Sequence, residues 1–215
     1  MSAAPYKTLM QRADDEFIVN KSRFIGYGAP VQTEEEALAF LAEIRKKHQD
    51  ATHNCYAYII GTNMGIMRYS DDGEPGGTAG MPIIEVMKAR GVTNAAVVVT
   101  RYFGGILLGA GGLVRAYTQG AVVALNAAQV GVMHPTQRVL VDVTYPMLGK
   151  VEHFLKSEPV IVEDKSFMDT ITLTIVVKTA DAEGFASRLI MQTDGRCEPI
   201  PMEEFYMAWP EEENA

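Results

Sequence analysis

The sequence predicts an α+β protein built from two domains, and three observations support this. Its 215 residues suit one large domain or two small ones. Short β-branched runs alternate with segments of helical period along the chain. Between residues 129 and 137, Gly131, His134 and Pro135 interrupt this alternation, and the charge balance changes at the same place.

The two parts of the chain differ in net charge. From Arg138 onward there are 7 Lys/Arg and 15 Asp/Glu, a net charge of −8, whereas the preceding residues carry 12 of each. We therefore place the domain boundary at the break. The expected organisation is an N-terminal extension over residues 1–16, domains over residues 17–132 and 136–208, and a tail over residues 209–215.

Strands and helices are expected to alternate in the first domain. Thr33 followed by Glu36 is a helix-start signal, in which the threonine side chain caps the first turn. The apolar, β-branched run over residues 95–100 is typical of a buried strand. Further strands are expected at 17–19, 24–31, 55–60 and 66–70, and further helices are expected from Pro82 and after Gly112.

The sequence of the second domain predicts strands and helices in the order βαββαβ, which is the ferredoxin-like pattern. In the run over residues 170–178, every second residue from Ile171 to Val177 is apolar, as in a strand with one buried face. Pro146 is placed to begin a helix. The expected strands are 138–145, 160–162, 170–178 and 198–208, and the expected helices start at Pro146 and cover 181–193.

Composition excludes several classes of protein. The apolar fraction of 47% is ordinary for a globular chain, and no apolar run is long enough to span a bilayer. The N-terminus lacks the apolar core of a signal peptide, so we expect a cytoplasmic protein with no membrane partner. Cys55 and Cys197 form no metal-binding pattern, and a disulfide framework is not expected. A monomer is the favoured oligomeric state.

The segment from Arg101 to Tyr117 is the first candidate site. It joins the buried strand to a helix through a glycine-rich loop, and a loop that ends at a helix N-terminus presents free N–H groups to an anion. Arg101 and Arg115 flank the loop and supply positive charge, while the alternative is a loop that only packs a helix closely on a sheet. The candidate RNA- or anion-binding residues are Arg101, Gly104, Gly105, Gly109, Gly111, Gly112 and Arg115.

The loop over residues 71–80 is the second candidate site. Asp71, Asp72 and Glu74 bring three carboxylates within four residues, which suits Mg²⁺ or acid–base catalysis. The alternative, which we favour for the metal question, is a solvated loop whose Asp residues cap turns and the next helix. His53 is a candidate proton carrier or phosphate contact. Apart from possible Mg²⁺, no cofactor is expected.

Three long motifs resemble the signature segments of the Impact family, in its bacterial YigZ-type branch. They are THNCYA at residues 52–57, SDDGEPGGTAG at residues 70–80 and RYFGGILLGAGGLVRAY at residues 101–117. The resemblance implies a first domain with the ribosomal protein S5 domain 2-like fold. It also implies a ferredoxin-like second domain similar to the last domain of elongation factor G. Eukaryotic members regulate translation by restraining a kinase, a role that we do not expect to transfer.

Three functional hypotheses remain open. In the first, a translation-associated regulator binds RNA or ribosomal particles through a groove lined by Arg101, Arg115 and the glycine loop, with His53 and Arg68 near it. In the second, an enzyme acts on a phosphorylated or anionic substrate, with a divalent metal held by Asp71, Asp72 and Glu74. In the third, the same surface binds a protein partner, as in an adaptor.

Overall fold

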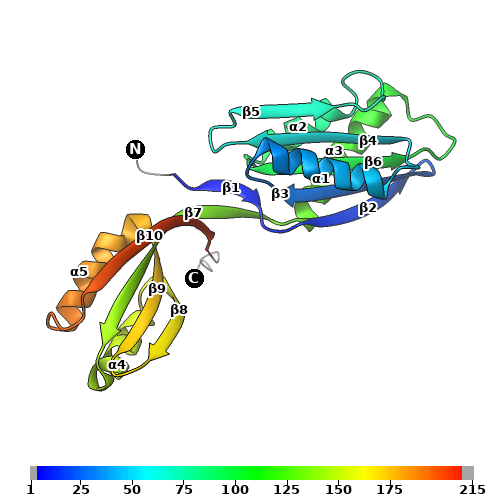
Figure 1. Cartoon of the computed structure of the whole chain (residues 1–215). Coiled ribbons are helices and arrows are strands. Elements are labelled where there is room, and N and C mark those ends of the chain that lie inside the picture. The colour runs from blue at the N-terminus through cyan, green and yellow to red at the C-terminus, as the bar shows by residue number, and fades with distance from the viewer. Residues whose placement is uncertain (1–3, 210–215) are drawn as a thin grey trace. The chain divides into compact units, whose positions relative to one another are not determined.

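The computed structural model describes residues 4–209 and divides the chain into two compact units (Figure 1). The first unit is Tyr6–Val132, and the described part of the second contains residues 133–209 together with residues 4–5. Both units combine an antiparallel sheet with helices, so the predicted α+β class with two domains is confirmed.

The first unit contains a five-stranded sheet in the order β2-β3-β6-β4-β5. The central strand β6 (Ala95–Tyr102) is buried along almost its whole length, because helices cover both faces of the sheet. Its apolar, β-branched sequence is the kind that a strand buried on both faces requires. The other strands are β2 (Ala13–Val19), β3 (Ser22–Pro30), β4 (His53–Ile60) and β5 (Ile66–Ser70).

Three helices complete the first unit as the outer layers of a sandwich (Figure 1). One face of the sheet packs on α1 (Glu34–Lys47), and the other packs on α2 (Gly80–Ala89) and α3 (Gly109–Ala127). As predicted, Thr33 caps α1, because its hydroxyl accepts the Glu36 N–H at 3.2 Å. A separate strand, β1 (Tyr6–Leu9), pairs with β7, the strand in which the unit ends.

The second unit has the ferredoxin-like order that the sequence predicts. Its strands lie in the order β10-β7-β9-β8, all antiparallel, and one face of the sheet packs on α4 and α5. The bounds are β7 (Val130–Val143), α4 (Leu148–Leu155), β8 (Val160–Phe167), β9 (Ile171–Lys178), α5 (Ala182–Gln192) and β10 (Pro199–Ala208). Short 3₁₀ turns, Tyr145–Met147 and Thr179–Asp181, precede the two helices.

The expected N-terminal extension over residues 1–16 was wrong for residues 6–9 and 13–16, which lie in β1 and β2. The expected interruption at 129–137 is also part of a strand, because β7 runs through Pro135. Pro135 pairs with Tyr206 of β10, while the pairing with β9 begins only at Thr136. A proline, which has no N–H to donate, is tolerated where a strand is paired on one side.

Other element ends differ from the expected ones for local reasons. Helices α2 and α3 start two to four residues earlier than predicted, at Gly80 and Gly109, because glycines carry no side chain from which a helical period can be recognised. Strand β8 continues to Phe167 through exposed polar residues. Of the expected tail over 209–215, Trp209 donates its indole N–H to Thr136 Oγ1 at 2.8 Å, and residues 210–215 lie outside the described residues.

Within residues 4–209, every helix is too short or too polar to traverse a lipid bilayer.

Close packing of α3 on the sheet gives the first testable prediction. A Cβ at Gly120 would lie 2.6 Å from Val99 Cγ1, so Gly120→Ala should lower the free energy of unfolding by about 1–3 kcal/mol despite the better helix propensity of alanine. Gly111→Ala is the matched control in the same helix, since its nearest neighbour would be 3.8 Å away. Urea denaturation of both variants tests this, and equal stabilities would contradict it.

Candidate functional site

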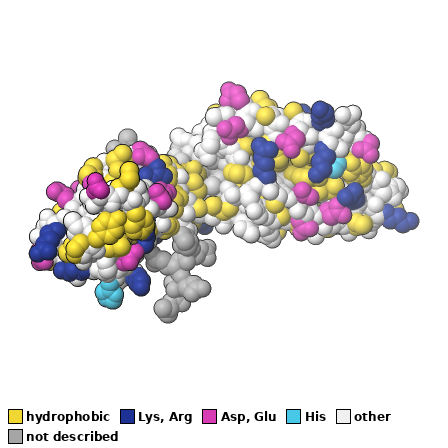
Figure 2. Space-filling model, turned by 60° about the horizontal axis from the view of Figure 1, so that its bottom comes forward, with side chains coloured by type: hydrophobic (Ala, Val, Ile, Leu, Met, Phe, Trp, Pro, Cys, Tyr) yellow, Lys and Arg dark blue, Asp and Glu magenta, His cyan; other side chains and the backbone are white. Residues whose placement is uncertain are grey.

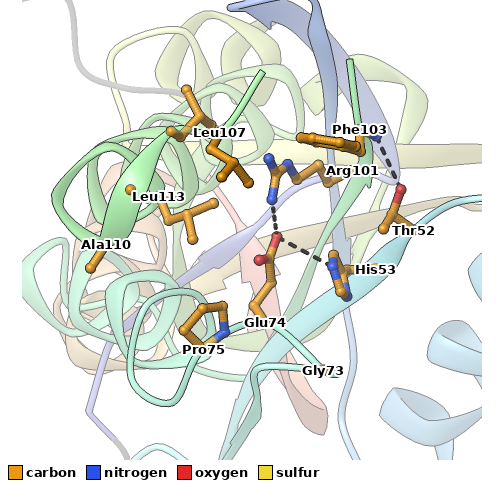
Figure 3. Close-up of a pocket in the computed structure, with 12 residues that line it drawn as sticks. Thr52, His53, Gly73, Glu74, Pro75, Arg101, Phe103, Leu107, Ala110 and Leu113 are labelled. Atoms are coloured by element: carbon orange, nitrogen blue, oxygen red, sulfur yellow. Dashed lines mark hydrogen bonds and ion pairs between the residues drawn. The ribbon is translucent and has the colours of Figure 1, made fainter. Parts of the chain in front are cut away.

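A pocket of about 420 Å³ lies at one end of the first unit's sheet (Figure 3). Because β4 and β6 are antiparallel neighbours, the first residue of β4, His53, lies opposite Arg101 near the end of β6. The loop before α2 and the first turn of α3 close the same end of the sheet. The lining residues are Thr52, His53, Gly73, Glu74, Pro75, Arg101, Phe103, Leu107, Leu108, Gly109, Ala110 and Leu113.

A buried ion pair forms the polar side of this pocket. Arg101 Nη1 donates to Glu74 Oε1 at 2.7 Å, and the two side chains are only 6% and 3% exposed. The guanidinium also lies between the rings of Phe24 and Phe103, 5.5 and 5.4 Å from their centroids. Arginine suits such a position because its planar cation pairs with a carboxylate and stacks on aromatic faces. Its Nε has no hydrogen-bond partner within the described part of the chain.

Glu74 is held by two further side chains. Tyr117 of α3 donates its hydroxyl to Glu74 Oε1 at 2.7 Å, and His53 Nε2 lies 3.8 Å from the same oxygen. Burial and the neighbouring carboxylate raise the pKa of the Tyr117 hydroxyl far above its ordinary value, so this group stays a donor. Figure 3 shows the side chains of Glu74, Arg101 and His53 converging. One carboxylate thus connects a loop, two strands and a helix.

The backbone fixes the orientation of His53. Its Nδ1 lies 2.9 Å from the carbonyl oxygen of Asp72. A carbonyl oxygen can only accept, so Nδ1 carries the hydrogen, and Nε2 of the neutral ring is an acceptor. Nε2 therefore faces Glu74 Oε1 with no hydrogen between the two atoms when the ring is neutral.

The three carboxylates of the loop have separate partners. Asp71 accepts the N–H groups of Gly77, Ala79 and Gly80 at 2.8–3.0 Å, so it organises the loop and the start of α2. Asp72 accepts the Asn54 N–H at 2.7 Å and pairs with Arg45 at 3.2 Å. The predicted role of Asp71 in capping turns and the next helix agrees with these bonds.

Asp71, Asp72 and Glu74 were the candidate metal ligands, and their separate partners hold the three carboxylates in different contacts. Over residues 4–209, no group of three or more His, Cys, Asp or Glu side chains is arranged to hold a metal ion. The loop therefore does not gather its three carboxylates into one ligand set.

The structure distributes the predicted glycine-loop residues over different roles. Only Arg101 and Gly109 of that set line the pocket, and the positive charge of Arg101 is compensated by Glu74. Gly104 lies against the backbone of Lys21 so closely that no Cβ would fit, which is the packing role considered as the alternative. Arg115 is exposed on α3, and Arg68, on β5, lies outside the pocket lining and pairs at 3.8 Å with Glu34. Gly105 and Gly109 have positive φ, of 82° and 69°.

The sequence patterns indicate neither a polar role for Tyr117 nor the pairing of Glu74 with Arg101. Tyr117 has the helical spacing of a core residue, and its hydroxyl is the only sign of a polar role. Glu74 lies 27 residues from Arg101 and 43 from Tyr117. Local sequence patterns carry no information about contacts between residues that far apart. The pairing is recognised only in the folded chain, where the two opposite charges are buried together.

Comparisons with known proteins agree with this architecture. Residues 20–125 match the Impact N-terminal domain, and residues 141–196 match a domain of unknown function, DUF1949. The chain is similar to the IMPACT family member YvyE of Bacillus subtilis, with 39% identity over 193 residues, 89% of this chain and 88% of that protein. It is 33% identical over 188 residues to the IMPACT family member YigZ of Escherichia coli, covering 86% and 92% of the two chains.

More distant likenesses extend to eukaryotes and to a solved structure. The protein IMPACT of Mus musculus is 39% identical over 94 residues, which are 41% of this chain and 29% of that protein. A crystal structure described as a hypothetical protein superposes with a TM-score of 0.59 and 30% identity, covering 93% of this chain and 98% of the other.

Removing one charge of the buried pair should destabilise the first unit. Glu74→Gln leaves the Arg101 guanidinium buried without its counter-charge, and we expect a loss of about 3 kcal/mol in the free energy of unfolding. Glu85→Gln makes the same chemical change in an exposed pair with Lys88 and should change stability by less than about 0.5 kcal/mol. Thermal and urea unfolding compare the two, and a Glu74→Gln variant as stable as its control would refute the structural role.

Asp71 should make stability depend on pH. Burial raises the pKa of this carboxyl, but three backbone donors outweigh burial and hold it below its usual range. The stabilisation is therefore present above about pH 4 and is lost as the pH falls through the folded-state pKa. Asp71→Asn should cost about 2 kcal/mol at pH 7. The difference from wild type should shrink below about pH 4, whereas a difference that does not vary with pH would disprove this account.

Proposed function

The chain belongs to the Impact family, and we propose that it is a translation-associated regulatory protein that binds RNA or ribosomal particles through the pocket at His53, Glu74, Arg101 and the start of α3. The link to translation rests on the relationship to the eukaryotic Impact proteins. The observation that carries the proposed site is the meeting of a buried, partly unsatisfied arginine with the N-terminus of a long helix in one pocket.

The N-terminus of α3 is suited to a phosphate group. This helix has 19 residues, and its first turn contains no acidic residue. Among the described residues, no side chain bonds to its N-terminal N–H groups as a cap. Gly109 and Ala110 line the pocket, so the first turn of α3 forms part of the cavity wall. Free N–H groups and the helix dipole both favour an anion at such a place.

The distribution of charged side chains supports a confined binding site more than an extended basic groove. On the face shown in Figure 2, Lys and Arg side chains are interspersed with Asp and Glu over the first unit. Arg101 is buried against Glu74, which leaves Arg115 as the exposed cation of the predicted pair. RNA binding of this kind would draw on few phosphate contacts, so its affinity would fall less steeply with salt than that of a basic surface.

An enzyme acting on an anionic small substrate is the second candidate. It is favoured by His53, whose Nδ1 is fixed by the Asp72 carbonyl so that Nε2 is an acceptor inside the pocket. A histidine oriented in this way is equipped to act as a general base. If Mg²⁺ takes part, it would be held by one of the loop carboxylates together with oxygens of the bound substrate.

Co-sedimentation with RNA and ribosomal particles, at low and moderate salt, tests the first proposal. Reversing the charge of Arg101 is unsuitable because it would place a second carboxylate beside buried Glu74. Ala110→Glu instead puts an exposed carboxylate in the first turn of α3, where it would occupy the proposed anion position. Gln119→Glu adds the same charge at an exposed position farther along the helix.

We expect wild type and Gln119→Glu to travel with the particles and Ala110→Glu to remain in the supernatant. Equal sedimentation of all three proteins would reject the pocket as the binding site. If wild type does not sediment at either salt concentration, RNA binding is rejected, and turnover assays on the His53 hypothesis take its place.

A further inference from the structure

We propose that the pocket accepts a single unpaired nucleotide whose base carries an exocyclic amino group, with its phosphate at the start of α3. This inference rests on the proposed function and specifies which part of an RNA the site would bind. Its basis is the acceptor of His53 that the pocket leaves unused, combined with an apolar wall of suitable size.

Two acceptors in the pocket lack a donor between them. His53 Nε2 and Glu74 Oε1 lie 3.8 Å apart, and the hydrogen of the neutral imidazole is on Nδ1, bonded to the Asp72 carbonyl. Two facing acceptors are unfavourable unless the ring is protonated or a donor is supplied from outside. Glu74 Oε1 already accepts from Arg101 Nη1 and from the Tyr117 hydroxyl, so the acceptor left without a donor is His53 Nε2. An N–H of an exocyclic amino group can donate to it.

The guanidinium of Arg101 has the opposite need. Nη1 is used by Glu74, but Nε is buried with no acceptor within residues 4–209. Because Nε is inaccessible from the cavity, the polar side of the pocket offers the unused acceptor of His53 beside a buried cation. The edge of a nucleobase carries complementary groups side by side, whereas a phosphate by itself offers only acceptors.

The rest of the pocket suits the flat body of a base. Pro75, Phe103, Leu107, Leu108 and Leu113 line it, and Phe103 and Leu107 are 45% and 84% exposed at its rim (Figure 3). A volume of about 420 Å³ is within the range of small-molecule sites and holds one base with its sugar. Proteins bind unpaired bases by stacking them on aromatic side chains and reading their edges.

A nucleotide with this orientation would also reach the helix N-terminus. Gly109 and Ala110 line the same cavity as His53 and Glu74, so a phosphate joined to the sugar can lie at the free N–H groups of α3. The site then combines three contacts on one ligand: an amino group at the His53 acceptor, a ring on an apolar wall and an anion at a helix terminus. A paired base in a duplex has its edge occupied by its partner and does not fit this scheme.

Calorimetric titration of the full chain with CMP, UMP and inorganic phosphate tests the inference. CMP and UMP have nearly the same size, but CMP has an amino group where UMP has a carbonyl. We expect CMP to bind about tenfold more tightly than UMP, since each correctly read base edge contributes discrimination of that order. Phosphate should bind more weakly than either. Phe103→Ala and Leu107→Ala should each weaken CMP binding, by about tenfold for the aromatic residue.

Ile106→Ala is the matched control. Ile106 belongs to the same loop, and its exposed fraction of 43% is similar to that of Phe103. It is outside the set of residues that line the pocket. This variant should bind CMP as wild type does. Because Leu107 is largely exposed, its truncation tests the site even if loss of the Phe103 ring disturbs Arg101.

The outcomes separate this inference from the proposed function. Equal binding of CMP and UMP, or no binding of either, overturns the nucleotide pocket. If RNA or ribosomal particles still bind wild type in that case, the proposed function stands without it. If the chain binds CMP with the expected preference but binds no RNA, the nucleotide pocket is supported and the translation role is rejected. Absence of all binding rejects both.

Discussion

The buried ion pair between Glu74 and Arg101 is the interaction on which the pocket end of the first unit depends. Glu74 comes from the loop between β5 and α2, and Arg101 comes from β6. Tyr117 of α3 donates to the same carboxylate oxygen, and His53 of β4 lies beside it. Because a charge buried without its partner is costly, these four elements are held in one arrangement. The loop keeps its shape through Asp71, whose carboxylate collects the N–H groups before α2.

Close packing of α3 brings the helix N-terminus to this ion pair. Gly120 in α3 and Gly26 in β3 let the helix backbone approach the sheet more closely than any side chain would allow. Tyr117, on the same helix face, is then fully buried and reaches Glu74. Of the two interpretations considered for the glycines of the segment, the packing role holds for Gly104, and the anion-binding role stays a proposal. Some allow tight packing, and Gly109 opens the first turn of α3 to the cavity.

In the second unit, the local sequence pattern predicts most of the fold. Alternating apolar residues along β9 face α4 and α5, and the ferredoxin-like strand order follows from that pattern and the two helices. At residues 129–137, the division between the two units falls between Val132 and Met133, inside the predicted boundary, but Pro135 lies within a strand where an interruption was expected. The proline is accommodated because β9 has not yet begun to pair at that position. The position at which a neighbouring strand begins to pair is a property of the sheet and has no signature in the residues of β7 themselves.

The sequence by itself determined the α+β class, the two domains, most of the helices and strands, and the family, because these depend on periodicity, capping residues and long contiguous motifs. It also identified the loop at residues 71–80, the glycine-rich segment and His53 as the chemically distinctive parts. Only the tertiary structure decided that Arg101 is buried against Glu74 and that Arg115 stays on the surface. The reason is physical: the charge of a side chain is visible in the sequence, whereas its burial and its partner arise from residues 27 and 43 positions apart that meet only when the sheet and α3 pack together.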